Sequence, residues 1–181
     1  MIKYAAFLRG INVGGHHIVK MADLRGLFGA LDFAENVRTY IQSGNVIFET
    51  SGATNSVVFT AEIEKLLRQA LGFEVRTMLR TFAELEEIAA QNPFKETDAA
   101  AGAKTYVTFL SAAPDAEAKN SLLAFASDFE AFRFGKRELY CRIRPGKPGK
   151  ELFSNNFIEK HLKVAATTRN TATVNKVLLL Q

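Results

Sequence analysis

One stretch near the N-terminus combines residue types that could hold an anion. It runs from Arg9 to Gly15 and contains Asn12 and the adjacent glycines Gly14 and Gly15. Glycines let backbone N–H groups approach a ligand closely, and a helix that starts after such a loop offers its positive end. The spacing matches neither the dinucleotide-binding Gly-x-Gly-x-x-Gly pattern nor a phosphate-binding P-loop. The stretch therefore indicates an anion or a nucleotide fragment as the ligand class, without a known motif.

A second polar cluster lies at a predicted tight turn. Gln42, Ser43 and Asn45 surround Gly44 between two short β-rich runs, and glycine can supply the positive φ angle that tight hairpins require. In a βαββαβ plait this turn lies at the same edge of the sheet as the loop after the first strand, which contains Arg9. The opposing interpretation is structural, because loops with several polar groups are also ordinary connectors. In that case the glycines turn the chain, Asn45 braces the hairpin and Arg9 pairs with a carboxylate.

The first half of the chain predicts the elements that position these residues. Apolar runs and helical spacing alternate in the order strand, helix, strand, strand, helix, strand. This is the order of the ferredoxin-like βαββαβ plait. The strands are expected over 3–9, 37–42, 45–49 and 74–79, and the helices from Met21 and over 53–71.

The second half repeats this order after a connecting segment. Thr81 and Glu84 form a predicted capping box, Asn92-Pro93 ends that helix, and a small, polar stretch follows over 96–103. We therefore predict an α+β protein of two tandem ferredoxin-like plaits with a C-terminal helix. The predicted parts are a first plait over 1–80, a connecting helix and loop over 81–103, and a second plait with the terminal helix over 104–181.

The second half is also the more basic one. Residues 1–92 hold nine basic and ten acidic residues, whereas 93–181 hold fourteen and nine. A predicted hairpin with its following loop concentrates this charge and places Tyr140, Arg142 and Arg144 on one side of a strand. Such a stripe could bind nucleic acid, although the RNA-binding motif is missing and a solvated hairpin has the same pattern. The nucleic-acid candidates are Arg133, Lys136, Arg137, Arg142, Arg144 and Lys147.

Other kinds of chemistry find little support. The single cysteine, Cys141, lies among alternating apolar residues, as a packed thiol would. His16 and His17 are adjacent and lack a third partner, so no metal site is predicted. No serine or cysteine is placed beside a histidine by the sequence, and no cofactor motif is present. With no signal-peptide or membrane-spanning pattern, we expect a cytoplasmic protein without a membrane partner, and the sequence sets no oligomeric state.

Several blocks together resemble the bacterial domain of unknown function 1697. They are Leu8 to Gly15, Lys20-Met21, Thr39 to Val46, Glu159-Lys160 and Thr167 to Asn170. The resemblance spans nearly the entire chain and implies two ferredoxin-like plaits, but it implies no activity.

Two departures from that family pattern stand out. The family usually continues Thr-Arg-Asn with tryptophan, where this chain has Thr171, and it has a Ser-Lys pair where this chain has Glu151-Leu152. Arg169 and Asn170, however, match the pattern.

Three functional hypotheses follow. The first is a site for an anionic or phosphorylated small ligand, and whether catalysis follows binding is left open. The second is a nucleic-acid-binding module that uses the basic hairpin at 133–150. The third is a structural or interaction protein without a ligand site. The residues of the first hypothesis are Arg9, Asn12, Gly14, Gly15, Gln42, Ser43, Asn45, Arg169 and Asn170.

Overall fold

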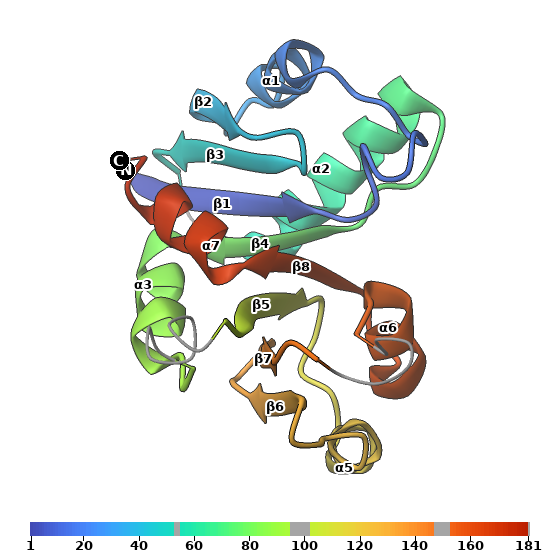
Figure 1. The fold of residues 1–181 in the computed structure, drawn as a ribbon. Coiled ribbons are helices and arrows are strands. Elements are labelled where there is room, and N and C mark those ends of the chain that lie inside the picture. The colour runs from blue at the N-terminus through green and yellow to red at the C-terminus, as the bar shows by residue number, and fades with distance from the viewer. Residues whose placement is uncertain (53–54, 95–101, 147–152, 181) are drawn as a thin grey trace. The chain divides into compact units, whose positions relative to one another are not determined.

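The computed structural model describes residues 1–52, 55–94, 102–146 and 153–180. The chain divides into two compact units (Figure 1). Unit 1 comprises Met1–Leu85 with Val177–Gln181, and unit 2 comprises Glu86–Lys176. Each unit holds one four-stranded antiparallel sheet and its own helices, so the predicted α+β class is confirmed.

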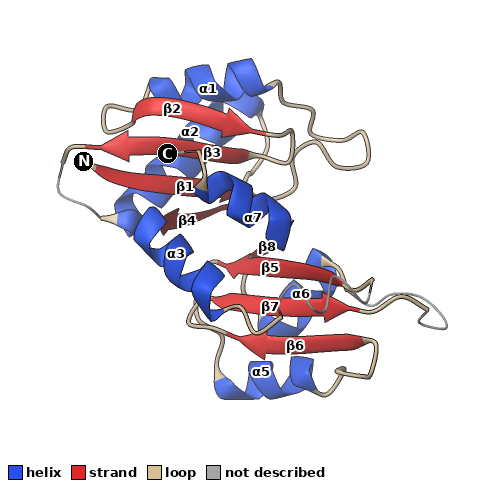
Figure 2. Cartoon of the chain, turned by 60° about the vertical axis from the view of Figure 1, so that its left-hand side comes forward, coloured by secondary structure: helices blue, strands red, loops and turns tan. Residues whose placement is uncertain are grey.

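Unit 1 contains the Arg9 stretch. Its sheet has the strand order β2-β3-β1-β4, and helices α1 and α2 cover one face of it (Figure 2). The elements are β1 (Ile2–Leu8), α1 (Met21–Gly29), β2 (Glu35–Tyr40), β3 (Asn45–Thr50), α2 (Ser56–Leu71) and β4 (Thr77–Thr81).

Unit 2 repeats the sheet with the strand order β6-β7-β5-β8. Its elements are β5 (Lys104–Leu110), α5 (Ala116–Leu123), β6 (Glu130–Phe134), β7 (Glu138–Ile143), α6 (Asn155–Leu162) and β8 (Ala166–Asn170). Two further helices directly follow the last strands of the two sheets: α3 (Phe82–Gln91) follows β4 and α7 (Thr171–Leu178) follows β8.

The ends of the helices follow from local chemistry. The Thr81 hydroxyl accepts from the N–H of Glu84 at 3.1 Å, and the Glu84 carboxylate accepts from the N–H of Thr81 at 2.7 Å, so the predicted capping box is present. Asn55 caps α2, which therefore begins at Ser56; the predicted start at 53 lies outside the described residues. Gly72, with φ of 78°, ends α2 as predicted.

The two sheets also agree in register. In unit 1, Ala5 of β1 lies opposite Arg80 of β4. In unit 2, Val107 of β5 lies opposite Arg169 of β8. The N–H of Leu8 donates to the carbonyl of Gly44 at 2.8 Å, and its counterpart Leu110 donates to Arg137 at 2.9 Å. The central strands of the two units therefore end at equivalent points.

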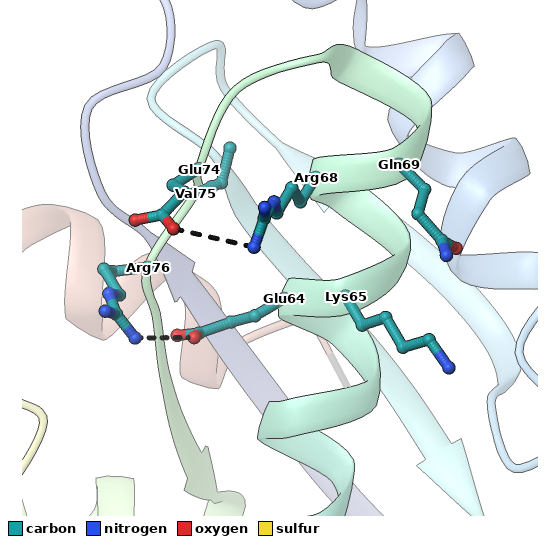
Figure 3. A pocket seen from close by; sticks show the side chains of 7 residues that line it. All are labelled: Glu64, Lys65, Arg68, Gln69, Glu74, Val75 and Arg76. Atoms are coloured by element: carbon teal, nitrogen blue, oxygen red, sulfur yellow. Dashed lines mark hydrogen bonds and ion pairs between the residues drawn. The ribbon is translucent and has the colours of Figure 1, made fainter.

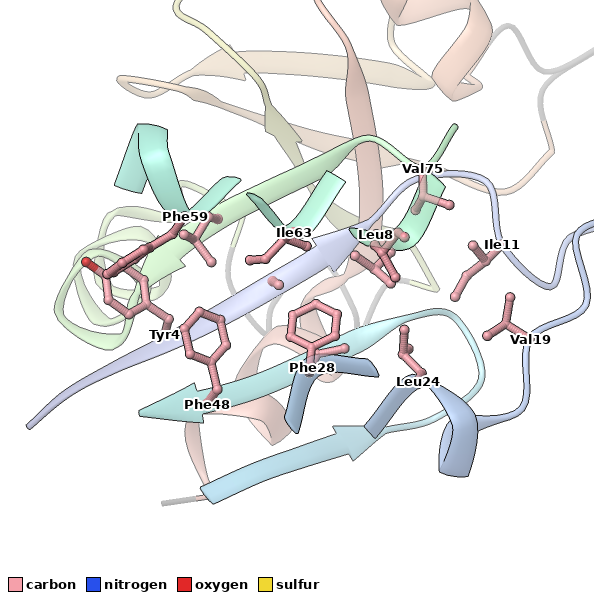
Figure 4. Close-up of a cluster of buried hydrophobic side chains, with 14 residues drawn as sticks. Tyr4, Leu8, Ile11, Val19, Leu24, Phe28, Phe48, Phe59, Ile63 and Val75 are labelled. Atoms are coloured by element: carbon pink, nitrogen blue, oxygen red, sulfur yellow. The ribbon is translucent and has the colours of Figure 1, made fainter. Parts of the chain in front are cut away.

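A hydrophobic core runs along β1, with aromatic rings near its first residues and Leu8, Ile11 and Val19 at the end from which the Arg9 stretch leaves (Figure 4). Tyr4 and Phe48 stack with ring centroids 5.5 Å apart, and Phe59 meets Tyr4 edge to face at 5.8 Å (Figure 4). Two residues of the loop after β1, Ile11 and Val19, are buried in this same core. The loop is thus anchored at two points along its length.

Within the described part of the chain, no helix combines the length and apolarity needed to cross a bilayer.

Candidate functional site

The loop between β1 and α1, here called the Arg9 loop (residues 9–20), is braced by the side chain of Asn12. Its Nδ2 donates to the carbonyls of Val19 at 3.0 Å and Gln42 at 2.8 Å, and its Oδ1 accepts from the N–H of Val19 at 2.8 Å. Asn12 therefore closes the loop and ties it to the β2–β3 turn, here called the Ser43 turn (residues 41–44). The predicted proximity of these two segments is confirmed.

The middle of the loop is a small hairpin. The N–H of His16 donates to the carbonyl of Val13 at 3.0 Å, and the two intervening residues, Gly14 and Gly15, have φ of 59° and 79°. Positive φ at both central positions is the geometry of a type I′ turn, which favours glycine. The local hydrogen bond accounts for both glycines as turn residues.

His17 fixes the base of this hairpin. Its ring stacks on Phe73 with centroids 4.0 Å apart, and its Nδ1 lies 3.1 Å from the carbonyl oxygen of Gly10. The N–H of Arg9 donates to the carbonyl of Arg76 at 2.8 Å. Together with Asn12, these contacts hold the Arg9 loop in one conformation.

The Ser43 turn is equally constrained. Asn45 is fully buried, and its Nδ2 donates to the carbonyl of Tyr40 at 2.8 Å and to the Ser43 hydroxyl at 3.1 Å. Gly44 has φ of 79° and packs against Leu8 and Ile11 so closely that a Cβ atom there would lie 2.7 Å from Ile11 Cδ1. Asn45 therefore braces the hairpin, while Gln42 offers an exposed side chain.

Three aliphatic side chains around this junction are exposed. They are Val13 (63% exposed), Ile18 (68%) and Ile41 (47%). Each is the neighbour in sequence of a residue that the Asn12 side chain joins: Asn12 itself, Val19 or Gln42. Contiguous exposed apolar patches mark binding surfaces, whereas single exposed apolar residues are normal. The sequence signal for them was weak, because isolated valine and isoleucine residues in a loop carry no motif.

Unit 2 shows that the fold itself does not need such a loop. There the equivalent connection, from β5 to α5, takes only residues 111–115, whereas unit 1 uses residues 9–20 between β1 and α1. The two connections start at equivalent points, since Arg9 donates to Arg76 and Ser111 donates to Ala165 at 2.8 and 2.9 Å. The seven additional residues in unit 1 form the braced hairpin.

Arg169 and Asn170 lie in unit 2, whereas the Arg9 loop and the Ser43 turn lie in unit 1. Arg169 is buried, and its guanidinium donates to the Thr167 hydroxyl and the Thr168 carbonyl, both at 2.9 Å. Burial lowers the pKa of Arg169 to about 10. Asn170 Oδ1 accepts from the N–H of Thr173 at 2.7 Å and caps α7. Both residues thus have structural contacts within unit 2.

The basic hairpin of unit 2 does not present its predicted aromatic stripe. Tyr140 is buried, and its hydroxyl donates to the carbonyl of Ile88 at 3.0 Å. Arg142 packs over the ring of Phe94, with its Cζ 5.3 Å from the centroid. Tyr140 is therefore unavailable for stacking on a base, contrary to what strand alternation alone predicted.

The other nucleic-acid candidates have local partners. The guanidinium groups of Arg133 and Arg144 donate to the carbonyls of Phe132 and Asp128, and Lys136 pairs with Glu87 at 3.2 Å. The N–H of Arg137 donates to Glu138. Lys147 lies outside the described residues.

Tyr140 provides a test of this buried contact. We expect Tyr140→Phe to lower the free energy of unfolding by about 1 kcal/mol at neutral pH, because the hydrogen bond to Ile88 is lost. Burial, helped by Glu138, raises the pKa of Tyr140 from 10 to about 12. Between these values the unfolded chain releases the phenol proton while the folded protein keeps it, so the native tyrosine loses stability as pH rises. Chemical denaturation should therefore show that the difference in free energy of unfolding between the native protein and Tyr140→Phe becomes smaller above pH 10. A difference that stays constant with pH would contradict the buried position of Tyr140.

Cys141 is buried, and burial raises the pKa of its thiol, as expected for a packed cysteine rather than a nucleophile.

The sequence did not predict a contact between the hydroxyl of Ser121 and the ring of His161. Ser121 Oγ lies 3.1 Å from His161 Nδ1, although 40 positions separate the residues. The ring of His161 also packs against Phe125 and Phe157. Both Ser121 and His161 lie on helices, whose backbone N–H groups are used in helical hydrogen bonds and cannot serve as oxyanion donors. This contact is therefore best explained as packing between α5 and α6.

No group of three or more potential metal-binding His, Cys, Asp or Glu side chains occurs among the described residues.

Comparison with known proteins shows the family to which the chain belongs. The family described as protein of unknown function (DUF1697) matches residues 1–140. The chain belongs to the DUF1697 family. A solved structure of a conserved bacterial protein from Streptococcus pneumoniae resembles this DUF1697 protein with a TM-score of 0.72 and 25% sequence identity, covering 98% of this chain and 97% of the other. No curated protein matches the chain.

Proposed function

We propose that this DUF1697 protein binds an anionic small molecule at the Arg9 loop and the Ser43 turn of unit 1. One observation carries the proposal: unit 1 builds a braced loop of residues 9–20 where unit 2 connects the same two elements through residues 111–115. Several residues of the loop hold positive φ angles, Asn12 and His17 among them, which is unfavourable for non-glycine residues. Such conformations are commonly retained at functional sites.

The charge of the two segments favours an anion. The Arg9 loop contains Arg9, Lys20 and two histidines, and neither it nor the Ser43 turn contains an aspartate or glutamate. Gln42 and Ser43 add polar groups at the same edge. Because Asn12 and Asn45 hold the backbone, they are positioning residues in this proposal, and Arg9, Gln42 and Ser43 are the groups offered to the ligand.

The exposed aliphatic side chains favour an organic ligand over a bare inorganic ion. Val13, Ile18 and Ile41 are exposed, and each is next in sequence to a residue of the junction that Asn12 forms, so a ligand with an apolar part at this junction would cover those that it reaches. The class we favour is therefore a phosphorylated or carboxylated molecule with an apolar portion, such as a nucleotide.

We also infer two ferredoxin-like plaits that arose by duplication, the first over 1–80 and the second, with the terminal helix, over 104–181. The βαββαβ element order, the strand order and the matching Arg80 and Arg169 registers support this inference. In such a plait the β1–α1 loop and the β2–β3 turn share one edge, which is where the ligand is placed.

Titration calorimetry with adenosine monophosphate and with inorganic phosphate tests the proposal. We expect the nucleotide to bind more tightly than phosphate, since only the nucleotide can cover the aliphatic group. Arg9→Gln should weaken nucleotide binding about tenfold or more, the loss expected for one charge-assisted hydrogen bond. Arg144→Gln in unit 2 makes the same change in charge and should leave binding unaltered. Failure of the native protein to bind either probe, or equal binding by the Arg9→Gln variant, would contradict the proposal.

A further inference from the structure

A cavity of about 420 Å³ lies in unit 1 between the C-terminal half of α2 and the segment that precedes β4. It shares no residue with the Arg9 loop or the Ser43 turn. Glu64 and Arg68, one turn apart on α2, both point toward the segment at 74–76 (Figure 3). The lining residues are Glu64, Lys65, Arg68, Gln69, Glu74, Val75 and Arg76.

One side of this cavity is fixed by a close ion pair. Glu64 Oε2 lies 3.1 Å from Arg76 Nη1, and Glu64 Oε1 accepts from the N–H of Thr77 at 2.8 Å. Both carboxylate oxygens are therefore occupied, and the pair links α2 to the start of β4. Val75 is buried next to it. Glu64 is the anchored member of this pair, because it is 24% exposed and also bonded to the backbone, whereas the Arg76 side chain is 59% exposed.

The other side is a much looser ion pair. Arg68 Nη1 and Glu74 Oε1 are 3.9 Å apart, and their side chains are 71% and 68% exposed. Exposed ion pairs of this kind contribute little to stability. Arg68 and Glu74 can therefore separate and bind other charged groups without unfolding the unit.

We propose that this cavity binds a small zwitterion with an ammonium and a carboxylate group, the chemistry of a free amino acid. The ligand carboxylate would pair with Arg68, whose guanidinium can donate two parallel hydrogen bonds, and the ligand ammonium would pair with Glu74. Insertion between the two side chains leaves each charge with a partner of opposite sign. The C-terminal end of α2 carries partial negative charge, which favours the ammonium end.

Ligands with a single charge fit this site less well. A simple anion at Arg68 would meet the nearby carboxylate of Glu74, and a simple cation at Glu74 would meet the guanidinium of Arg68. The volume of about 420 Å³ lies within the range of small-molecule pockets. The inference is independent of the ligand proposed for the Arg9 loop.

Backbone amide NMR shifts provide the test. We expect L-alanine, L-glutamate or L-leucine to shift amides within 64–76, while acetate and methylammonium at the same concentration and ionic strength do not. Arg68→Gln and Glu74→Gln should each weaken the amino acid's binding about two- to fivefold, the effect expected when one solvent-exposed ion pair is lost. Both replaced side chains are exposed, so the variants should fold, as their unshifted amides elsewhere would verify.

Lys160→Gln is the matched control. Lys160 is exposed on α6 of unit 2 and does not line the cavity, so removing its positive charge should leave the binding constant unchanged. Equal weakening by Lys160→Gln, equal shifts with acetate, or no shift with the three amino acids would overturn the proposal. Shifts confined to 9–20 and 41–44 would instead support the Arg9-loop site alone, so the two proposals fail separately.

Discussion

Replacing Gly44 with alanine is expected to lower the free energy of unfolding by about 3 kcal/mol, from backbone strain combined with overpacking. Gly44 has φ of 79°, and an added Cβ would lie 2.7 Å from Ile11 Cδ1 and 2.9 Å from Leu8 Cβ. Leu8 and Ile11 are buried in the core of unit 1, so neither can move away easily. The Ser43 turn and the Arg9 loop should both become more mobile, because Gly44 of the turn packs against Ile11 of the loop.

Gly15→Ala is the control for backbone strain alone. Gly15 also has φ of 79°, but nothing lies within 4 Å of the position that a Cβ would take. We therefore expect a loss of only about 1 kcal/mol. Urea denaturation with an unchanged denaturant slope measures both losses. Equal losses for the two variants would show that the close contact at Gly44 is not a significant constraint.

Replacing Asn12 with aspartate should have a similarly large effect. The change keeps the shape of the side chain and the oxygen that accepts from Val19, but it removes the donor to the carbonyls of Val19 and Gln42. A carboxylate would then face two carbonyl oxygens, and we expect a loss of about 2 to 4 kcal/mol. The Arg9 loop should open, because Asn12 is the side chain that ties it to the Ser43 turn.

Limited proteolysis with trypsin after Lys20, together with urea denaturation, measures this effect. Asn12→Asp should be cleaved there much faster than the native protein. Asn120→Asp makes the same change on an exposed position of α5 and should alter neither cleavage nor stability noticeably. A native cleavage rate at Lys20 in Asn12→Asp would mean that the loop is held by other contacts.

Much of the fold was predictable because local chemistry and tertiary structure agree. The Thr81–Glu84 capping box and the glycine after α2 are local signals, and both are present. The last strand of unit 1 was less predictable: the pattern indicated 74–79, whereas β4 covers Thr77–Thr81. Residues 74–76 instead run beside α2, where Glu64 and Arg68 pair with Arg76 and Glu74. The partners of these ion pairs are 6 and 12 positions apart, a spacing that produces no helical or strand periodicity in the sequence.

The sequence predicted that the two segments of the candidate site lie together, but not which of their side chains are buried and which are exposed. The element order placed the Arg9 loop beside the Ser43 turn, and the hydrogen bond from Asn12 to Gln42 joins them. The sequence could not tell which polar side chains face inward. Asn45 is fully buried as a brace, and Tyr140 is covered although its strand predicted an exposed stripe. Asn45 contacts its own turn, at Tyr40 and Ser43, whereas Tyr140 is held by Ile88, which only the folded chain brings near.

The most direct test of the ligand proposal is an amide NMR titration of the native protein with adenosine monophosphate, at constant ionic strength. The proposal predicts saturable shifts concentrated in residues 9–20 and 41–44, which should need about ten times more nucleotide in the Arg9→Gln variant and the native amount in Arg144→Gln. Shifts that are absent from both segments, or that occur mainly in the basic hairpin of unit 2, would contradict it.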